Sequence, residues 1–403
     1  MEKTINRWQI LVASTAVLLC TGAIYAFSVF AGPLSQVKGW SMEEIMLAFT
    51  INAAVGPITM ILGGFLTDKG LAKWVIAVGG FAFSLGFFLT GLAQSPLMLY
   101  LTYGVLSGLG QGFAYSSCLS NTIRLFPDKR GLASGLITAG MGGAAIIAAP
   151  IANTLIESKD VMFAFRMMGI AYLIVVLIAS FFIKRAPENY KPKGWSAKNP
   201  RTTRNAYNRN WQEMLRTREF YLIIIMLLMG SFSGLMIASN AAVIGQQMFH
   251  LTMRTAAFYV SLYSLCNCLG RVIWGTISDI LGRAKTLLVI YTVVSLSLLV
   301  MTFFSSGGAF AVGIIGLGLC FGGVMGVFPS IVMENYGPMN QGTNYGIVFI
   351  GYSTAAFFGP RVASAIAENN QGNFTNAFYV AIVLAIIGLI LDFIYIQMKN
   401  KAI

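Results

Sequence analysis

The chain has 403 residues, of which 57% are hydrophobic and only 10% charged, and its formal net charge is +13. This composition excludes an ordinary soluble domain and predicts a polytopic membrane protein. The positive charge is spread over short segments, so it argues against nucleic-acid binding and for contact with anionic lipid headgroups of the bilayer.

Continuous apolar runs of about 20 residues predict an all-α membrane protein with twelve transmembrane helices. Strands of a transmembrane barrel would instead alternate apolar and polar residues over about 10 positions. The predicted helices start near residues 8, 44, 74, 97, 132, 162, 219, 255, 285, 309, 343 and 374.

Twelve crossings would place both termini on one side of the membrane, and 21 of the 27 Lys and Arg fall on that side. The exceptions outside the membrane are Lys38, Lys159, Arg166 and Arg254. The positive-inside rule therefore predicts a multi-pass plasma (inner) membrane protein with cytoplasmic termini. We expect a bacterial protein that works as a monomer.

The first, fourth and seventh predicted helices carry polar side chains inside apolar sequence. Tyr25 and Ser28 are three residues apart in the first, Tyr115 lies in the fourth, and Asn240 lies in the seventh. A phenol in an apolar span needs a hydrogen-bond partner. These four residues are therefore candidates for a substrate site, and ordinary bonds between helices are the alternative.

A basic, proline-containing stretch, residues 184–217, separates six predicted helices from six. We interpret it as a cytoplasmic linker between an N-terminal bundle (1–183) and a C-terminal bundle (218–403). The halves match at one offset of 211 residues, which indicates a duplicated six-helix unit of the kind found in transporters. The matching pairs are Gly64 and Gly275, Asp68 and Asp279, Gly131 and Gly342, and Gly135 and Gly346.

Two of these matched residues are acids next to cations at the ends of predicted spans. Asp68 is followed by Lys69, and Asp279 is followed by Arg283 and Lys285. Such a carboxylate can accept hydrogen bonds from a helix N-terminus and pair with a cation, so we expect a conformational latch. The alternative is a solvated loop whose charges only set the membrane topology.

Arg271 is the one charge in an apolar run from Thr255 to Ile277. A guanidinium does not deprotonate, and its insertion near the bilayer centre costs about 2.5–3.5 kcal/mol, so it predicts an anion site. Asn267 lies four residues earlier, about 40° around the same helix face, where its amide can orient the guanidinium or bind substrate. The alternative is a structural Arg paired with a buried acid, and Glu334 and Asp392 are the acids nearest to span interiors.

Several motifs together give a family resemblance. The two acidic loops resemble the loop motif of the major facilitator superfamily, closely in the second copy and less so in the first. Within it, the chain is similar to the oxalate/formate antiporter family and its monocarboxylate-transporting relatives for lactate and pyruvate. The matching segments are Phe126–Gly135, Glu213–Thr217, Asn267–Arg271, Phe328–Ser330, Asn344–Gly346 and a stretch of the first helix around Tyr25.

The resemblance implies that Arg271 is the substrate-binding cation. Oxalate-transporting members have a Lys six residues after the Asn-Tyr-Gly motif, where this chain has Tyr352. One fixed cation favours a monocarboxylate such as lactate or pyruvate, because a dianion would leave one charge unpaired in a dry site. Arg361 is rotated by about 180° from Tyr352, so we interpret it as reaching toward the lipid headgroups, with a vestibule role as the alternative.

The coupling mechanism stays open in the sequence. His250, the single histidine, falls in an outer loop, and Asn267 does not titrate, although many proton-coupled relatives have Asp there. The remaining routes are exchange against a counter-anion, a proton carried through Arg271 and substrate, or a proton on Asp392 or Glu334.

The overall prediction is a secondary active transporter, working by antiport or symport, that binds its anion between two halves and needs no cofactor. An oxalate/formate antiporter and a non-transporting carboxylate sensor are the alternatives, and an efflux carrier for cations would need an intramembrane acid. No metal-spaced His or Cys cluster, phosphate loop or nucleophile triad is present, so we do not expect an enzyme. The five cysteines lie in apolar runs and are interpreted as packing residues.

Overall fold

The computed structural model describes residues 6–187, 190–192 and 208–401. Within these ranges the chain forms helices and connecting loops, with no strand, as the sequence predicts. Half of the predicted basic linker, residues 188–189 and 193–207, lies outside the described part of the chain.

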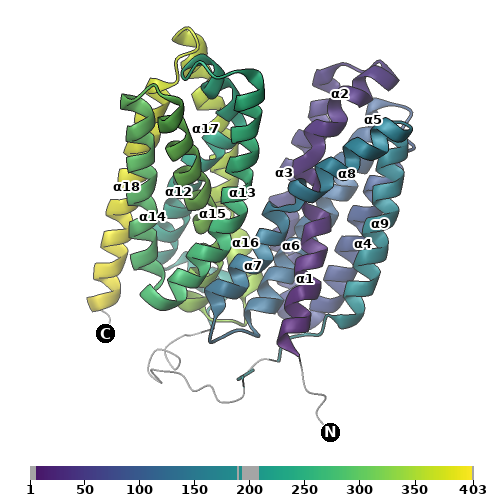
Figure 1. The fold of residues 1–403 in the computed structure, drawn as a ribbon. Helices are drawn as coiled ribbons and strands as arrows, with labels where there is room; N and C mark the ends of the chain where they lie inside the picture. Colours follow the sequence, from purple (N-terminus) through teal and green to yellow (C-terminus); the bar gives the residue numbers. More distant parts are fainter. Residues whose placement is uncertain (1–5, 188–189, 193–207, 402–403) are drawn as a thin grey trace. The chain divides into compact units, whose positions relative to one another are not determined.

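The first half of the chain forms a series of helices that are broken in several places (Figure 1). They are α1 (Arg7–Thr21), η1 (Gly22–Ala26), α2 (Phe27–Lys38), α3 (Met42–Leu66), η2 (Thr67–Leu71), α4 (Ala72–Thr90), α5 (Pro96–Leu99), η3 (Tyr100–Ser107), α6 (Gly108–Ile123), α7 (Arg130–Gly142), α8 (Ala144–Ser158) and α9 (Val161–Phe182).

The second half has longer unbroken helices. They are α11 (Trp211–Leu215), α12 (Arg218–Gln247), α13 (Met253–Leu281), α14 (Arg283–Phe303), α15 (Gly307–Tyr336), α16 (Gln341–Val348), α17 (Ile350–Asn369) and α18 (Thr375–Lys401).

Polar side chains mark the starts of many helices. Ser41 and Glu44 form a reciprocal capping box at α3, and Asp160 Oδ1 accepts from the Phe163 N–H at the start of α9. These caps satisfy backbone donors that would otherwise have no partner in an apolar setting. The turns after α3 and α13 use Gly70 and Gly282 at φ +93° and +88°, a region that glycine adopts without strain.

Nine helical segments in the described part of the chain are long and apolar enough to cross a membrane. One of them, Met42–Thr90, has 49 residues and contains α3 and α4 on either side of the Gly70 turn. The predicted helices near residues 97 and 343 are present as α5–η3–α6 and α16–α17, but they are not among these nine segments. All twelve predicted starts fall within two residues of a helix start.

Close contacts divide the chain into two compact units. Unit 1 comprises Met1–Asp128, Gly140–Trp211 and Met333–Ile347, and unit 2 comprises Lys129–Ala139, Gln212–Val332 and Val348–Ile403. The division is not a single cut at the linker. Each unit includes one short segment from the other half of the sequence, and both segments carry matched glycines of the repeat.

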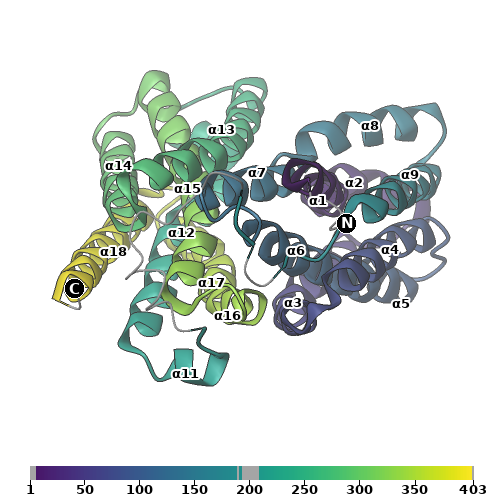
Figure 2. The ribbon, with the colours of Figure 1, turned by 90° about the horizontal axis from the view of Figure 1, so that it is seen from below.

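Unit 1 packs around a cluster of aromatic rings. In Figures 1 and 2, α1, α4, α6 and α9 run alongside their neighbours, and their contacts agree with this arrangement. The rings of Phe30 and Phe165 stack at 4.3 Å, and Phe87 contacts both Tyr103 and Phe165. In lipid such close van der Waals packing, rather than exclusion of water, holds helices together.

Unit 2 combines packing with buried hydroxyl bonds. The Tyr263 hydroxyl on α13 donates to the Gly234 carbonyl on α12 at 2.6 Å, and the Tyr291 hydroxyl on α14 donates to the Met226 carbonyl at 2.6 Å. Both phenols thus find the partners that buried Tyr requires. These bonds tie α12 to the helix that carries Arg271 and to α14.

Candidate functional site

Arg271 lies on α13 in unit 2, with a side chain that is buried although no carboxylate pairs with it in the described residues. Its residue exposure is 6%. Nε donates to Asn267 Oδ1 at 3.0 Å, and Nη1 donates to the Thr138 carbonyl at 2.7 Å. Among the described residues no acceptor takes a hydrogen bond from Nη2. The guanidinium is therefore held at Nε and at Nη1, and it keeps donor capacity at Nη2.

Asn267 is equally buried, at 6% exposure, and like Arg271 it uses only part of its hydrogen-bonding capacity among the described residues. The Oδ1 atom accepts from Arg271, whereas no hydrogen bond of Nδ2 occurs within residues 6–187, 190–192 and 208–401. A carboxylate has two oxygens that suit two such N–H donors. Besides the bond between them, the pair therefore leaves an anion two donor groups, Arg271 Nη2 and Asn267 Nδ2.

Glycines hold the backbone of α13 close to its neighbours at this level. A Cβ placed on Gly322 of α15 would overlap the Asn267 carbonyl, and one on Gly135 of α7 would overlap the Arg271 carbonyl. Gly326 also meets the Arg271 carbonyl. Because three glycines from two helices press on the same turn of α13, the backbone beneath Asn267 and Arg271 is tightly positioned within unit 2.

Tyr352 lies on α17 in unit 2, in a stack of aromatic rings. Its ring is 4.5 Å from the Phe349 ring and 6.4 Å from the Phe321 ring, with an angle of 6° to the latter. Phe321 precedes Gly322, the residue that meets Asn267. Tyr352, a predicted site residue, therefore stacks on the residue of α15 that precedes the glycine packed against Asn267.

Asn240 on α12 uses both ends of its amide within unit 2. Nδ2 donates to the Met236 carbonyl at 3.0 Å, and Oδ1 accepts from the Ser364 hydroxyl on α17 at 3.2 Å. This geometry corresponds to the alternative of a bond between helices. Ser364 was not a predicted partner, because nothing in the sequence pattern connects two residues that are 124 positions apart.

The remaining predicted site residues belong to unit 1. Tyr25 in η1 is 43% exposed and Ser28 in α2 is also exposed, whereas Tyr115 in α6 is buried. Tyr25 and Ser28 follow one another along one surface of the same broken helix. Their roles in substrate binding stay predictions.

Asp279 accepts hydrogen bonds from the start of α7 within unit 2. Its two oxygens accept from the Gly131 and Leu132 N–H groups, each at 2.9 Å, and Arg283 Nη2 donates to Oδ1 at 2.6 Å. A carboxylate at this position is stabilised by both the helix N-terminus and the cation. A Cβ on Gly131 would overlap the Gly275 carbonyl, so the contact requires glycine.

Asp68 makes the corresponding contacts with the start of α16 within unit 1. It accepts from Gly342 N–H at 3.0 Å and from Thr343 N–H at 2.8 Å, and it forms an ion pair with Arg124. The Gly64 backbone meets Gly342. Both acidic loops of the repeat therefore use the same geometry.

The cation partner of Asp68 differs from the sequence prediction. Lys69 lies over the Phe65 ring at 4.3 Å, and Arg124 at the end of α6 makes the ion pair instead. Lys285 in the second loop is exposed, whereas Arg283 is buried. The first loop has no counterpart of Arg283, and this gap in the repeat was the available signal that its cation comes from elsewhere.

The Asn-Tyr-Gly motif also has a structural role that the sequence did not suggest. Asn344 Nδ2 donates to the Arg209 carbonyl at 2.9 Å, and Asn340 Nδ2 donates to the same oxygen at 3.2 Å. The Arg209 N–H donates to the Tyr336 carbonyl at 3.0 Å. The end of the linker is thus bound to the loop before α16 in unit 1.

The other sequence candidates make no hydrogen bond or ion pair with Arg271 among the described residues. Arg361 on α17 is exposed, donates to the Phe357 carbonyl of its own helix at 2.9 Å and covers the Phe357 ring. His250 is exposed in the loop after α12. Glu334 belongs to the segment of α15 that is part of unit 1. A search of the described residues finds no group of three His, Cys, Asp or Glu side chains that could hold a metal.

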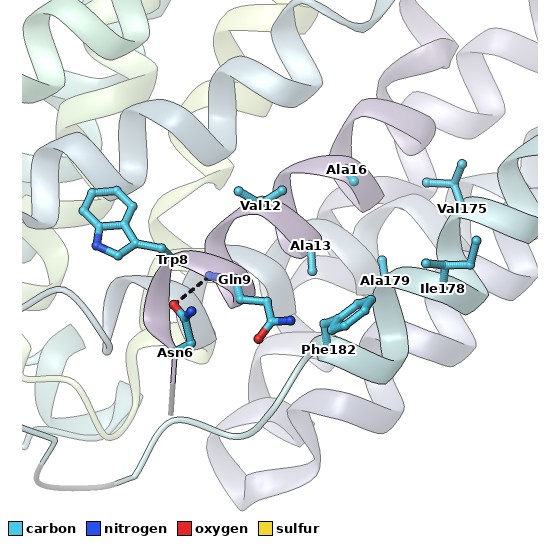
Figure 3. Close-up of a pocket in the computed structure, with 10 residues that line it drawn as sticks. All are labelled: Asn6, Trp8, Gln9, Val12, Ala13, Ala16, Val175, Ile178, Ala179 and Phe182. Carbon is cyan, nitrogen blue, oxygen red and sulfur yellow. Dashed lines mark hydrogen bonds between the residues drawn. The ribbon is translucent and has the colours of Figure 1, made fainter. Parts of the chain in front are cut away.

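A cavity of about 620 Å³ lies between α1 and α9 of unit 1 (Figure 3). Its walls are mostly apolar, including Val12, Ile178 and Phe182, and Asn6 and Gln9 lie at the end near the start of α1. None of its ten lining residues is charged, so it offers an anion no countercharge. None of the predicted substrate-binding residues lines it.

Comparison with known proteins gives one consistent result. The family model described as Major Facilitator Superfamily matches residues 13–336 and, in a second match, 237–402. The oxalate:formate antiporter of Oxalobacter formigenes is 28% identical over 96% of this chain and 90% of its own length. Monocarboxylate transporter 12 of Xenopus laevis is 23% identical over 93% of this chain and 85% of its own.

A solved structure confirms the fold at a lower level of identity. The proton:xylose symporter XylE, bound to 6-bromo-6-deoxy-D-glucose, superposes with a TM-score of 0.75. It is 12% identical, and the match covers 95% of this chain and 94% of that one. At this identity the likeness concerns the arrangement of helices alone.

Proposed function

This chain belongs to the major facilitator superfamily and is a multi-pass membrane transporter, and from that premise we propose that it carries small monocarboxylates by alternating access. The substrate class is that of lactate and pyruvate. Exchange against another anion and symport with a proton are both compatible with this proposal. We further propose that both termini lie in the cytoplasm of a bacterium, at its inner membrane, and that the protein works as a monomer.

The observation that carries the proposal is the partly satisfied guanidinium of Arg271. Its Nε and Nη1 atoms bond to Asn267 and to the Thr138 carbonyl, and neither acceptor is charged. A buried cation without a carboxylate is costly, and a substrate anion on Nη2 and the Asn267 amide would offset that cost. A curated relative named as an oxalate:formate antiporter and another named as a monocarboxylate transporter support an anion of this class.

The valence of the substrate follows from the number of fixed cations. Tyr352 stands where oxalate-transporting relatives have Lys, and its ring is held by Phe349 and Phe321. A second carboxylate would enter a dry site without a partner, at a cost of several kcal/mol. An oxalate/formate antiporter is therefore the second candidate, favoured by the overall similarity but not by Tyr352.

We assign the acidic loops to the conformational change. Asp68 binds the start of α16 and Asp279 binds the start of α7, each with an Arg as cation. Breaking one set of hydrogen bonds at a helix N-terminus and forming another is a discrete step that a transport cycle can use. Lys69 and Lys285 contribute to the positive charge of these loops.

The test is uptake of labelled lactate, pyruvate, formate and oxalate into liposomes that hold the purified protein, with and without internal counter-anion and a pH gradient. Removing one partner of a buried charge pair costs about 2–5 kcal/mol, so Arg271→Ala should lose at least about thirtyfold in apparent affinity. Arg271→Lys should be impaired as well, because Lys lacks the planar fork.

The matched control is Arg361→Gln, which removes a second Arg from an apolar helix but leaves the Asn267–Arg271 pair intact. We expect it to keep uptake close to that of the wild type. If Arg271→Ala binds the anion with the affinity of the wild type, the assignment of Arg271 to the anion site is wrong. Oxalate as the best substrate, with uptake stimulated by internal formate, would favour the antiporter. Specific binding of a carboxylate without uptake under every gradient would favour a membrane-embedded sensor.

A further inference from the structure

Asp392 on α18 is a buried carboxyl group that the proposed transport site does not use. It is 0% exposed, and neither Oδ1 nor Oδ2 has a hydrogen-bond partner among the described residues. Nearly all buried polar groups in proteins have such a partner, and charged groups buried without one are especially costly. The state of this carboxyl group therefore needs an explanation.

The group lies in the contact of α18 with α12 and α14, which are neighbours in Figure 1. Gly388, one turn earlier on α18, meets the Tyr291 ring of α14, and Gly230 of α12 meets the same ring. The Tyr291 hydroxyl donates to the Met226 carbonyl. Residues four apart share a helix face, so Asp392 belongs to the face that packs on Tyr291.

Among the described residues, the helices around Asp392 supply no ion-pair partner for a carboxylate. On α14, Arg283 bonds to Asp279 and Ser278, and Lys285 is exposed. The charged residues of α12 are Arg218 and Glu219 at its start, and on α17 Arg361 is exposed over Phe357 and Glu368 is also exposed. On α18 itself, Lys399 lies over the Tyr395 ring.

Tyr291 on α14 is a titratable group that interacts electrostatically with Asp392. A phenol hydroxyl that already donates one hydrogen bond can still accept another. No hydrogen bond joins the two side chains among the described residues, so an ionised Asp392 would have neither a donor nor a cation to stabilise it, whereas the neutral acid carries no charge. The surroundings thus suit the neutral acid.

We propose that Asp392 is a proton-binding site of unit 2, which holds its proton while α18 packs on α12 and α14 and releases it only when that packing opens. The proposal goes beyond the transported anion, because it does not depend on Arg271 or on the identity of the substrate. It gives pH an influence on the helices that carry Asn240 and the latch cation Arg283.

The first test is infrared difference spectroscopy of the purified protein in lipid nanodiscs at neutral pH, without substrate. A protonated carboxyl has a carbonyl stretch distinct from that of a carboxylate. We expect this band in the wild type and its loss in Asp392→Asn. Asp160→Asn is the control and should keep the band, because it removes a different, half-buried acid and leaves a side chain that can still cap α9. A spectrum of Asp392→Asn with the full wild-type band would overturn the proposal.

The second test uses the dependence of folding stability on pH. If the folded protein binds a proton that the unfolded chain has lost, the folding equilibrium constant falls as pH rises, by about tenfold per pH unit above the ordinary Asp range. Thermal or denaturant unfolding of the wild type should show this slope. Asp392→Asn and Asp392→Leu, which stay neutral, should lack that contribution.

Equal slopes in wild type and variants would contradict a bound proton. Both neutral variants should fold as well as the wild type, because they mimic the protonated acid in charge, and failure of both to fold would also overturn the proposal. Neither measurement involves transport. A negative result at Arg271 and a negative result at Asp392 can therefore be told apart.

Discussion

Arg271 depends on one side chain of its own helix for the orientation of its guanidinium. Asn267 accepts from Nε, and the Thr138 carbonyl accepts from Nη1. If the amide is removed, Nε loses its acceptor and the planar fork can rotate about the bond that remains. Under the proposed function, this would change anion affinity more than it changes the stability of the fold.

We therefore expect Asn267→Ala to raise the KM for monocarboxylate uptake by about ten- to a hundredfold, since a hydrogen bond to a charged group contributes about 1.5–3 kcal/mol. Kinetics in liposomes measure this change. Ser264→Ala is the matched control on α13, because within the described part of the chain the Ser264 hydroxyl bonds only to the Val260 carbonyl of its own helix. An unchanged KM in Asn267→Ala would remove this residue from the anion site.

The contact between Arg271 and Asn267 could be predicted from the sequence, because a lone charge in an apolar run and a spacing of four residues are visible without a structure. It could not predict the Thr138 carbonyl, since a backbone acceptor 133 positions away has no residue-type signature. The same limit applies to Arg124, which replaces Lys69 as the partner of Asp68. Local patterns identify charged residues, whereas tertiary packing selects their partners.

At the scale of helices, the apolar runs were sufficient to place all twelve starts within two residues of an observed helix start. The interruptions were less visible: η1 and η3 change the winding of otherwise continuous apolar segments, and α7 ends at Gly142, just before α8 begins at Ala144. These breaks depend on close approaches such as that of Gly22 to Met141. A hydropathy pattern does not contain that information.

The close contact between Gly131 and Gly275 is an element-scale feature with a testable consequence. A Cβ on Gly131 would overlap the Gly275 carbonyl and crowd the Ser278 hydroxyl. We expect Gly131→Ala to separate the start of α7 from Asp279, to lower the stability of the purified protein by about 1–3 kcal/mol and to slow uptake. Thermal unfolding and initial uptake rates measure the two effects.

Gly32→Ala provides the control, because nothing lies within 4 Å of a Cβ at that position in α2. In a helix, Ala is favoured over Gly by about 1 kcal/mol, so this variant should be as stable as the wild type or more so. If Gly131→Ala has the stability and uptake of the wild type, the contact between α7 and α13 at this glycine contributes to neither.

At the scale of the whole molecule, the duplicated sequence produces two equivalent contacts in two different units. Asp279 reaches Gly131 across 148 positions within unit 2, and Asp68 reaches Gly342 across 274 positions within unit 1. The offset of 211 residues predicted that the motifs correspond. It did not predict that the matched acid and glycine meet, because the assignment of residues 129–139 and 333–347 to the opposite units depends on the folded contacts.

Because the two acids share no partner, their contributions to stability should be nearly independent. Asp68→Asn and Asp279→Asn each replace a carboxylate that accepts two backbone N–H bonds and an Arg, so each should cost about 1.5–3 kcal/mol. The double variant should cost the sum within about 0.5 kcal/mol. Unfolding of the purified proteins measures all three, and Asp160→Asn, which can still cap α9, serves as the control.

If the double variant is as stable as the less stable of the two single variants, the two acids are not independent and belong to one shared network. Uptake adds a second criterion, because a latch must also be released. If the two loops act at different steps of the cycle, each single variant should change the maximal rate while leaving the KM for the anion near that of the wild type. A raised KM in either variant would place that acid in substrate binding rather than in the conformational change.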